Sequence, residues 1–313
     1  MSDRLVSSCL PDRVALALEK VDKAYRYKIS EIRMRVNNPT TLTIEGQNYY
    51  LRANGNINSQ GKDFVFLSSA ELEEFIYKFC RGSVYAYEES IKQGYITRNG
   101  VRVGLCGTVF LKNGEIGGFS SYSSVNVRIP HHISGVSEKL VYDIEQRGFA
   151  GGGILVVSPP GDGKTTFLRD ISCRLSSGIN IGGNKKCFRV CIIDERNEIF
   201  MPDVFKNCPV DVLQNCPKEK AIELSLRTLN PEIIICDEIG TESEAKAISK
   251  AHTGGIILIA SVHGSCMKDV TKYSEINSLI QKRIFKRGVF LHRTRGINQN
   301  IVCFESEGVD FYD

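Results

Sequence analysis

The chain has 313 residues, of which 42% are hydrophobic and 24% are charged, and its formal net charge is +4. This length allows two domains with cores of their own. The composition is that of an ordinary globular protein, and so small a charge does not by itself indicate nucleic-acid binding. No apolar run reaches the roughly 18 residues of a membrane span, and the first residues lack the apolar centre of a signal peptide. We therefore expect a cytoplasmic protein.

The eleven cysteines are scattered and include no C-x-x-C pair. Cys187, Cys191 and Cys236 fall in or beside apolar segments that we expect to be strands. Free thiols packed as small apolar groups in a reducing compartment are therefore the favoured interpretation. Neither the thiols nor the five histidines have the spacing of a zinc site.

Residues 1–145 predict a small α+β domain. In chain order we expect a helix at 11–27, a half-buried strand at 29–36, a hairpin at 40–51, a helix from 68 to 79, hairpins that turn at 99–100 and 113–114, and a helix at 136–144. Ser68 and Glu71 have the spacing of a capping box at the start of the second helix. We place the end of this domain near residue 146, before three consecutive glycines.

Residues 154–166 are the most informative stretch. An apolar run of strand length ends at Pro159, and a helical pattern begins after Gly163. Strand, tight loop and helix form the context of a phosphate-binding loop, because backbone N–H groups at the start of such a helix point at an anion. Lys164 would reach the β- and γ-phosphates of ATP, and the Thr165 hydroxyl would bind Mg²⁺. The predicted ATP-binding residues are Ser158, Pro159, Pro160, Gly161, Asp162, Gly163, Lys164, Thr165 and Thr166.

Two positions of this loop depart from the pattern G-x-x-x-x-G-K-[ST]. Ser158 stands where the first glycine is expected, and it would be strained if the backbone there required a positive φ. Asp162 puts a carboxylate beside the phosphates, which is unfavourable unless the side chain faces solvent. The alternative is an ordinary strand, turn and helix with a chance Gly-Lys-Thr.

From residue 146 to 313, strands alternate with helices, which predicts an α/β, RecA-like core with a mainly parallel sheet. Ligands of such sheets bind outside the carboxyl ends of the strands. Four polar clusters follow predicted strands directly: the phosphate loop and residues 194–198, 237–238 and 261–263. We expect these clusters to face one another.

Each cluster offers candidate catalytic residues. Asp237 would hold Mg²⁺ through water, and Glu238 would orient or deprotonate the attacking water. Glu195 and Glu198 are further candidates for that base, and His263 is a further catalytic candidate. The alternatives are a solvated turn for the Asp-Glu pair, acids at a helix start for the earlier cluster, and a structural role for the histidine.

The order of these motifs resembles that of the secretion-type ATPases of type II and type IV systems, which have an additional acidic box and a histidine box. Along nearly its full length the chain resembles the stage III sporulation protein AA family. The resembling stretches are EIRMRV (31–36), GYITRNGVRVGLCGT (94–108), VNVRIP (125–130), SPPGDGKTTFLRDIS (158–172), IIDERNEI (192–199), DVLQNCPK (211–218) and LRTLNPEIIICDEIG (226–240). The chain departs from the family at Ser158, Asp162 and 260–263, where the family more often reads Gly, a small residue and Ala-Thr-Ala-His.

The resemblance implies an ATPase that uses Mg²⁺ and assembles with copies of itself into a hexameric ring. It implies action on the mother-cell side of the channel between mother cell and forespore during endospore formation. Membrane channel proteins of the sporulation complex would be partners, with peripheral contact to the membrane and without nucleic acid. Nucleotide at a subunit interface, as in the family, calls for an arginine that stabilises the transferred γ-phosphate. Arg227 is the first candidate, followed by Arg128 and Arg102, and the alternative for each is a surface arginine.

Two other functions stay open. One is a nucleic-acid-stimulated ATPase of the helicase or loader kind, whose binding would weaken steeply with salt. The other is a nucleotide-gated scaffold with weak turnover, if Ser158 and Asp162 impair hydrolysis. A basic run from Lys282 to Arg295 would meet acidic lipid, a partner or nucleic acid, or would be a solvated helix face followed by an edge strand.

Overall fold

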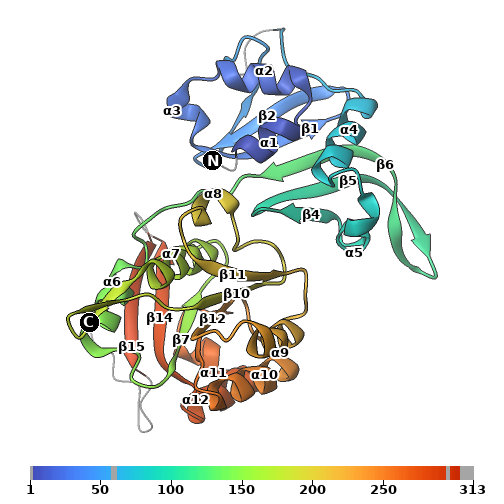
Figure 1. The fold of residues 1–313 in the computed structure, drawn as a ribbon. Helices are drawn as coiled ribbons and strands as arrows, with labels where there is room; N and C mark the ends of the chain where they lie inside the picture. Colours follow the sequence, from blue (N-terminus) through green and yellow to red (C-terminus); the bar gives the residue numbers. More distant parts are fainter. Residues whose placement is uncertain (1–2, 58–61, 294–296, 304–313) are drawn as a thin grey trace. The chain divides into compact units, whose positions relative to one another are not determined.

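The computed structural model describes residues 3–57, 62–293 and 297–303. The chain divides into two compact units, residues 1–131 and 132–313 (Figure 1). The boundary predicted near residue 146 falls inside helix α6 (Glu138–Arg147), whose Leu140 and Ile144 are fully buried in the core of the second unit. The whole helix therefore belongs to the second unit, and the division lies before it.

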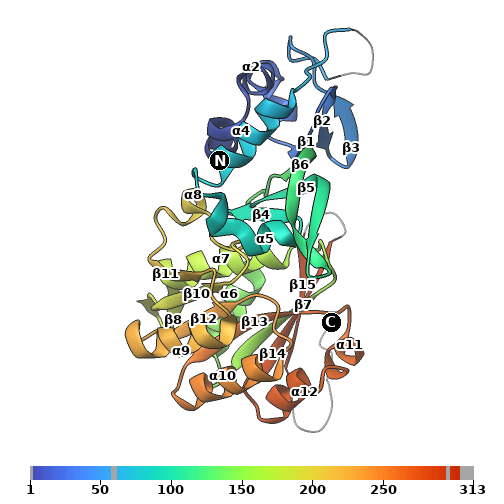
Figure 2. The ribbon, with the colours of Figure 1, turned by 90° about the vertical axis from the view of Figure 1, so that its right-hand side faces the viewer.

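The first unit is an antiparallel sheet of six strands in the order β3-β2-β1-β6-β5-β4. Its strands are β1 (Ile29–Arg35), β2 (Asn38–Ile44), β3 (Gln47–Tyr50), β4 (Tyr95–Arg98), β5 (Val101–Lys112) and β6 (Glu115–Arg128). Its helices are α1 (Asp3–Cys9), α2 (Asp12–Lys20), α3 (Lys23–Arg26), α4 (Ser69–Phe79), the 3-10 helix η1 (Val84–Tyr87) and α5 (Glu88–Lys92). Helices α1, α2 and α4 lie on one side of strands β1 and β2 and share one apolar core with them (Figure 2).

Local sequence signals account for several elements of this unit. Asn99, Gly100, Asn113 and Gly114 all have positive φ, as tight hairpin turns between antiparallel strands require, so both predicted hairpins are confirmed. The capping box at the start of α4 is also confirmed. The predicted helix at 11–27 is wrong as a single helix. It breaks after α2, and Asp22 caps the short α3 by accepting a hydrogen bond from the Ala24 N–H at 2.7 Å.

The second unit is a seven-stranded sheet in the order β11-β10-β12-β13-β7-β14-β15, in which only β15 runs antiparallel to its neighbour. Its strands are β7 (Gly153–Ser158), β10 (Val190–Asp194), β11 (Val210–Gln214), β12 (Ile233–Cys236), β13 (Ile257–His263), β14 (Phe285–Arg293) and β15 (Ile297–Cys303). Strands β8 (Ile179–Ile181) and β9 (Asn184–Lys186) form a separate hairpin. Besides α6, its helices are α7 (Lys164–Ser177), α8 (Pro202–Phe205), α9 (Lys218–Thr228), α10 (Glu242–Thr253), α11 (Met267–Thr271) and α12 (Ser274–Gln281).

Helices cover both faces of this sheet, as expected for parallel strands. Along β7, Ile154 and Val156 enter a core with α6 and α7, whereas Leu155 and Val157 enter a second core with α9, α10 and α12 (Figure 1). A strand buried on both faces must be apolar at every position, which explains the unbroken apolar run before the phosphate loop. The predicted mainly parallel sheet is confirmed.

Two predicted details of the second unit are wrong. The sequence pattern predicts the last helix at 277–285, but α12 ends at Gln281, because the chain turns at Arg283, where φ is 58°, and Phe285 begins strand β14. Cys187 is exposed, whereas Cys191 and Cys236 are buried as expected. Within the described ranges, no helix combines the length and the apolar character that crossing a bilayer requires.

Candidate functional site

The phosphate loop joins β7 to α7, and its glycines make the geometry that the sequence predicts. Gly161 has a φ of 86° and Gly163 has a φ of 98°, values that an L side chain rarely adopts. Gly163 is the residue before the first turn of α7, so the loop leads directly into the helix N-terminus. Thr165 and Thr166 lie half-buried in that first turn.

Ser158 fits its position without the strain that the sequence suggested. It is the last residue of β7, its φ is not positive, and its side chain is fully buried. Its hydroxyl donates to the Pro159 carbonyl at 2.9 Å, and its own carbonyl accepts from Lys164 Nζ at 3.1 Å. Asp162, whose carboxylate is unfavourable beside phosphates unless it faces solvent, is half-buried.

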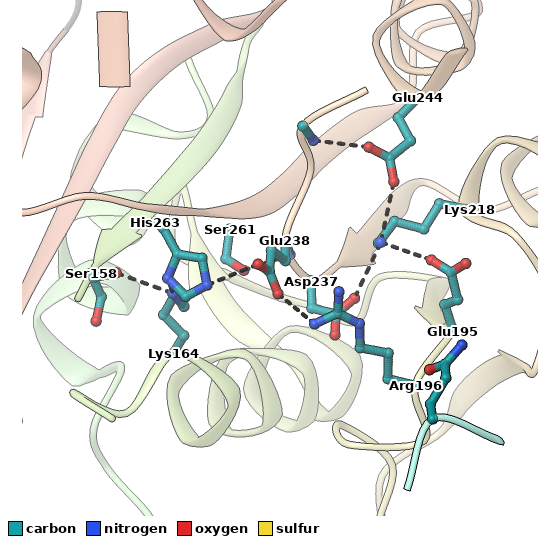
Figure 3. A network of polar contacts seen from close by, with 12 residues as sticks. Ser158, Lys164, Glu195, Arg196, Lys218, Asp237, Glu238, Glu244, Ser261 and His263 are labelled. Carbon is teal, nitrogen blue, oxygen red and sulfur yellow. Dashed lines mark hydrogen bonds and ion pairs between the residues drawn. The ribbon is translucent and has the colours of Figure 1, made fainter. Parts of the chain in front are cut away.

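Lys164 and His263 meet beside the loop (Figure 3). They are brought together because β13 pairs with β7 in a register that sets His263 opposite Ser158. Lys164 Nζ contacts His263 Nδ1, and His263 Nε2 lies 2.8 Å from Glu238 Oε1. A neutral imidazole with its hydrogen on Nε2 satisfies both contacts, since it accepts from the ammonium and donates to the carboxylate. Burial lowers the pKa of Lys164, and the charges of Glu238, Asp237 and Asp162 oppose this effect.

Glu238 is fixed at its backbone and at both carboxylate oxygens. Its φ of 29° is unusual for a residue with a side chain, and its N–H donates to Ser261 Oγ at 2.9 Å. While Oε1 faces His263, Oε2 accepts from Arg196 Nη1 at 2.7 Å (Figure 3). Arg196 lies in the loop that follows β10, and sequence reasoning did not single it out.

Asp237 is buried directly after β12. Its Oδ1 has no hydrogen-bond partner, and the nearest cation, Lys218 Nζ, is 4.0 Å away. Burial raises the pKa of Asp237 to about 7, and the charge of Lys218 opposes the shift. A buried carboxylate oxygen that lacks a hydrogen bond fits a hydrated cation in front of it.

The residues present fit Mg²⁺ shared with a nucleotide rather than a metal held by protein alone. Among the residues that the structure describes, no group of three or more His, Cys, Asp or Glu side chains could hold a metal ion. Phosphate-loop sites hold Mg²⁺ through one hydroxyl, one acid, water and phosphate oxygens. Thr165 and Asp237 offer that hydroxyl and that acid.

The loop after β10 is organised by Asp194, which is fully buried. Its carboxylate accepts from the backbone N–H groups of Glu198, Ile199 and Phe200 at 2.8, 3.0 and 2.9 Å. Arg169 of α7 donates to the carbonyls of Ile199 and Glu198 at 2.7 and 2.6 Å. The phosphate-loop helix and the acidic loop are therefore joined by hydrogen bonds. The carboxylate of Glu198 contributes to the raised pKa of Asp237.

Glu195 forms an ion pair with a residue that sequence reasoning missed. Its Oε2 lies 2.8 Å from Nζ of Lys218, whose side chain is only 4% exposed and which also lies 3.2 Å from Glu244 Oε1 (Figure 3). Lys218 is the first residue of α9, which follows β11, so it stands at the same edge of the sheet as the acids. That position was the signal in the sequence that could have identified it.

The structure does not bring Arg227 together with the phosphate loop. Helix α9 begins at the carboxyl edge of the sheet and returns toward the opposite edge, where Arg227 stands in its last turn. There its side chain is exposed, and its Nε donates to the Glu223 carbonyl at 3.3 Å. Arg128 and Arg102 lie opposite each other on β6 and β5 of the first unit. Arg128 pairs with Glu31 at 3.3 Å, and the Arg102 guanidinium lies 3.9 Å from the Tyr95 ring centroid.

The basic run at the C-terminal end is not a continuous solvated face. Arg287 is buried and lies 3.1 Å from Asp143 Oδ2 of α6, and Lys286 donates to the Ala150 carbonyl at 2.8 Å. Arg295 lies outside the described residues. The interpretation of this run as a surface for lipid or nucleic acid is therefore wrong for Arg287.

Comparisons with known proteins identify the family of the chain. A family model described as "Sporulation stage III, protein AA" matches residues 5–309. The "Stage III sporulation protein AA" of Bacillus subtilis (strain 168) is 30% identical over 309 residues, which are 97% of this chain and 95% of that protein. The "Protein SEEDLING PLASTID DEVELOPMENT 1" of Arabidopsis thaliana is 32% identical over 160 residues, which are 49% of this chain and 22% of that protein.

Solved structures share the fold. The pilus retraction motor PilT with bound ADP has a TM-score of 0.61 at 15% identity, over 93% of this chain and 83% of that chain. The ATPase DotB of Legionella pneumophila has a TM-score of 0.58 at 16% identity, over 90% of this chain and 78% of that chain. The predicted RecA-like α/β core preceded by a smaller α+β unit is thus confirmed as the fold that these two structures share with the chain. The chain belongs to the stage III sporulation protein AA family.

Proposed function

We propose that this chain binds ATP at the phosphate loop and hydrolyses it with Glu238 as the residue that orients and deprotonates the attacking water. The observation that carries the proposal is the bridge made by His263, whose two ring nitrogens meet Lys164 and Glu238. A phosphate-binding lysine and a fixed carboxylate on either side of one imidazole suit a reaction in which water attacks the γ-phosphorus. His263 is then placed to respond when a γ-phosphate draws Lys164 toward itself.

Other acids suit this role less well. Glu195 is paired with a buried ammonium, and Asp194 is saturated by backbone N–H groups. Both therefore serve structure rather than proton transfer in this proposal. Thr165 and Asp237 would hold Mg²⁺, the latter through water. Bound Mg²⁺ would neutralise charge on the phosphate oxygens.

We further propose that copies of the chain assemble into a hexameric ring that serves the channel between mother cell and forespore, on the mother-cell side and in contact with membrane channel proteins. Membership of a sporulation family and the fold of a pilus retraction motor support this proposal. Arg128 and Arg102 remain candidate arginine fingers. They are neighbours on one face of the sheet, and a ring could present that face to a nucleotide. Arg227 would reach a nucleotide only across a subunit interface.

The test is phosphate release from Mg²⁺–ATP by the full chain, measured across protein concentrations with Lys164→Ala and Glu238→Gln. We expect Glu238→Gln to retain ATP binding and to lower the turnover rate about 10²–10⁴-fold, which is the usual contribution of a general base. Lys164→Ala should lose binding and turnover together. Lys246→Met removes an exposed ion pair of α10 and serves as the control.

Three outcomes would redirect the proposal. Full turnover in Glu238→Gln would remove that residue from its role. Tight ATP binding by the wild type without phosphate release would favour a nucleotide-gated scaffold. Turnover that rises with added DNA or RNA and falls with salt would favour a nucleic-acid-stimulated ATPase.

A further inference from the structure

A cluster beside the candidate site contains one cation and three acids, of which Lys218, Asp237 and Glu244 are buried and Glu195 is partly exposed. Lys218 is surrounded by Glu195 from the loop after β10, by Asp237 from the end of β12 and by Glu244 from the first turn of α10 (Figure 3). The loop after β10 and the segment that joins β12 to α10 thus meet at a single ammonium. We call these four residues the Lys218 cluster.

Lys218 makes two kinds of contact within the Lys218 cluster, hydrogen bonds and a longer contact between charges. Glu195 and Glu244 lie at hydrogen-bond distance from Nζ, at 2.8 and 3.2 Å, whereas Asp237 Oδ1 is 4.0 Å away and has no hydrogen bond. At 4.0 Å Lys218 attracts Asp237 by charge without a hydrogen bond, which leaves the lone pairs of Oδ1 available.

Glu244 extends the cluster to the backbone beside Asp237. Its Oε2 accepts from the N–H groups of Gly240 and Thr241, each at 2.8 Å, while Oε1 faces Lys218. Those hydrogen bonds fix the turn that follows Glu238. On the other side, Glu195 is the neighbour of Arg196, which holds the Glu238 carboxylate. Lys218 is thus connected to the Asp237–Glu238 pair in two ways, through Glu244 and the turn that it fixes and through Glu195 and its neighbour Arg196.

The charges of the cluster explain why a lysine is needed. The three carboxylates would repel one another, and Asp237 and Glu244, which are buried, would also lose hydration; one enclosed cation compensates for both effects.

We propose that Lys218 is a positioning residue for the metal site: it fixes the acidic loop against the 237–241 turn and keeps Asp237 Oδ1 unbonded and facing a hydrated Mg²⁺. The inference rests on the proposed function, since it concerns Mg²⁺–nucleotide at the same loop. Lys218 contacts the acids and not the reacting atoms.

The experiment compares ADP binding with and without Mg²⁺ by calorimetry in wild type, Lys218→Met and Lys218→Arg, together with the Mg²⁺ concentration that gives half-maximal phosphate release. We expect Lys218→Met to lose roughly 10–100-fold in apparent Mg²⁺ affinity, as when an outer partner of a metal ligand is removed. Binding of ADP in EDTA should change less than about twofold, because the phosphate loop is intact. Lys218→Arg, which keeps the charge, should recover part of the Mg²⁺ affinity.

Lys250→Met is the matched control, since Lys250 makes an exposed ion pair with Glu223 on the same pair of helices. If Lys218→Met does not fold, the double variant Lys218→Met/Glu195→Gln reduces the uncompensated charge and gives the same comparison. Unchanged Mg²⁺ dependence in a folded Lys218 variant would overturn the inference. Equal loss of ADP binding in EDTA and in Mg²⁺ would do so as well, because it would indicate a general structural role. A wild type that binds no nucleotide would instead refute the proposed function.

Discussion

Arg196 Nη1 and Glu238 Oε2 form an ion pair 2.7 Å long between residues 42 positions apart in the sequence. The pair joins the loop after β10 to the turn after β12, two strands that are neighbours in the sheet. Both side chains are partly exposed, so solvent screens the attraction and the pair contributes little to stability. The pair instead orients the Glu238 carboxylate, because it fixes one of the two oxygens of this candidate base.

Replacing Arg196 by Met should therefore affect turnover more than binding. Without its ion pair the Glu238 carboxylate keeps only His263, and we expect kcat to fall about tenfold, part of what a positioned base contributes. The KM for ATP should stay within about threefold of wild type. Steady-state phosphate release measures both constants, with Lys246→Met as the control. A larger change in KM than in kcat would show that Arg196 serves nucleotide binding instead.

His263 variants separate the two contacts of the imidazole. His263→Gln retains an N–H that reaches toward Glu238, whereas His263→Ala loses both contacts. We expect His263→Ala to lower kcat about 100-fold and His263→Gln to lower it less, because only the alanine leaves Glu238 without this donor. ATP affinity, measured by calorimetry, should change little in either. Equal losses of kcat in the two variants would contradict a role for the Nε2 contact.

Asp194 should matter for stability rather than for chemistry. In Asp194→Asn an amide NH₂ faces backbone donors that the carboxylate satisfied, and the charge opposite the buried Arg169 is lost. We expect a loss of about 1–3 kcal/mol in the free energy of unfolding, the cost of leaving buried donors unsatisfied. Calorimetry should detect a Tm lowered by about 2–10 °C. Asp211→Asn on the neighbouring strand β11 is exposed and should leave the Tm unchanged.

The capping box of α4 predicts a pH dependence of stability. Burial tends to raise the pKa of Glu71, but hydrogen bonds from Ser68 and the charge of Arg13 outweigh it and hold the pKa below its ordinary value of 4.5. A carboxyl whose folded pKa is lowered stabilises the fold above its unfolded pKa, and this contribution is lost as pH falls through the folded pKa. The free energy of unfolding of wild type should therefore be about 0.5–1 kcal/mol larger than that of Glu71→Gln at neutral pH, and this difference should vanish in acid.

Because the chain has no tryptophan, circular dichroism during urea unfolding is the suitable measurement. Glu73→Gln, an exposed carboxylate of the same helix, is the control and should show no such difference. A gap between wild type and Glu71→Gln that persists in acid would exclude the ionised carboxylate as its cause.

The features predicted correctly from the sequence are those set by neighbours along the chain. The Asn-Gly turns require positive φ at adjacent residues, and glycines between a strand and a helix indicate the phosphate loop. Strand β7 is apolar at every position because helices cover both faces of the sheet. Each of these signals lies within about a dozen residues, which is the range over which periodicity and turn chemistry act.

The features that sequence reasoning missed depend on which strands become neighbours. Lys218 meets its acids only because β11, β10 and β12 lie side by side, and Arg196 reaches Glu238 for the same reason. Charged residues at such positions look like solvated surface groups until the strand order is known. The burial of Arg287 was missed likewise, because its partner Asp143 lies on α6, far away in the sequence.

Helix α7 has a second attachment besides the phosphate loop. Six residues beyond Lys164, the carboxylate of Asp170 accepts hydrogen bonds from the Gly135 and Ser137 N–H groups at 3.0 and 2.8 Å, and from the Ser137 hydroxyl at 2.6 Å. These residues follow His132, where the second unit begins. A helix is stiff over so short a span, so α7 holds the phosphate loop and the first residues of the second unit on one rigid segment. Lys164 and Asp170 are thereby kept about 9 Å apart along the helix axis.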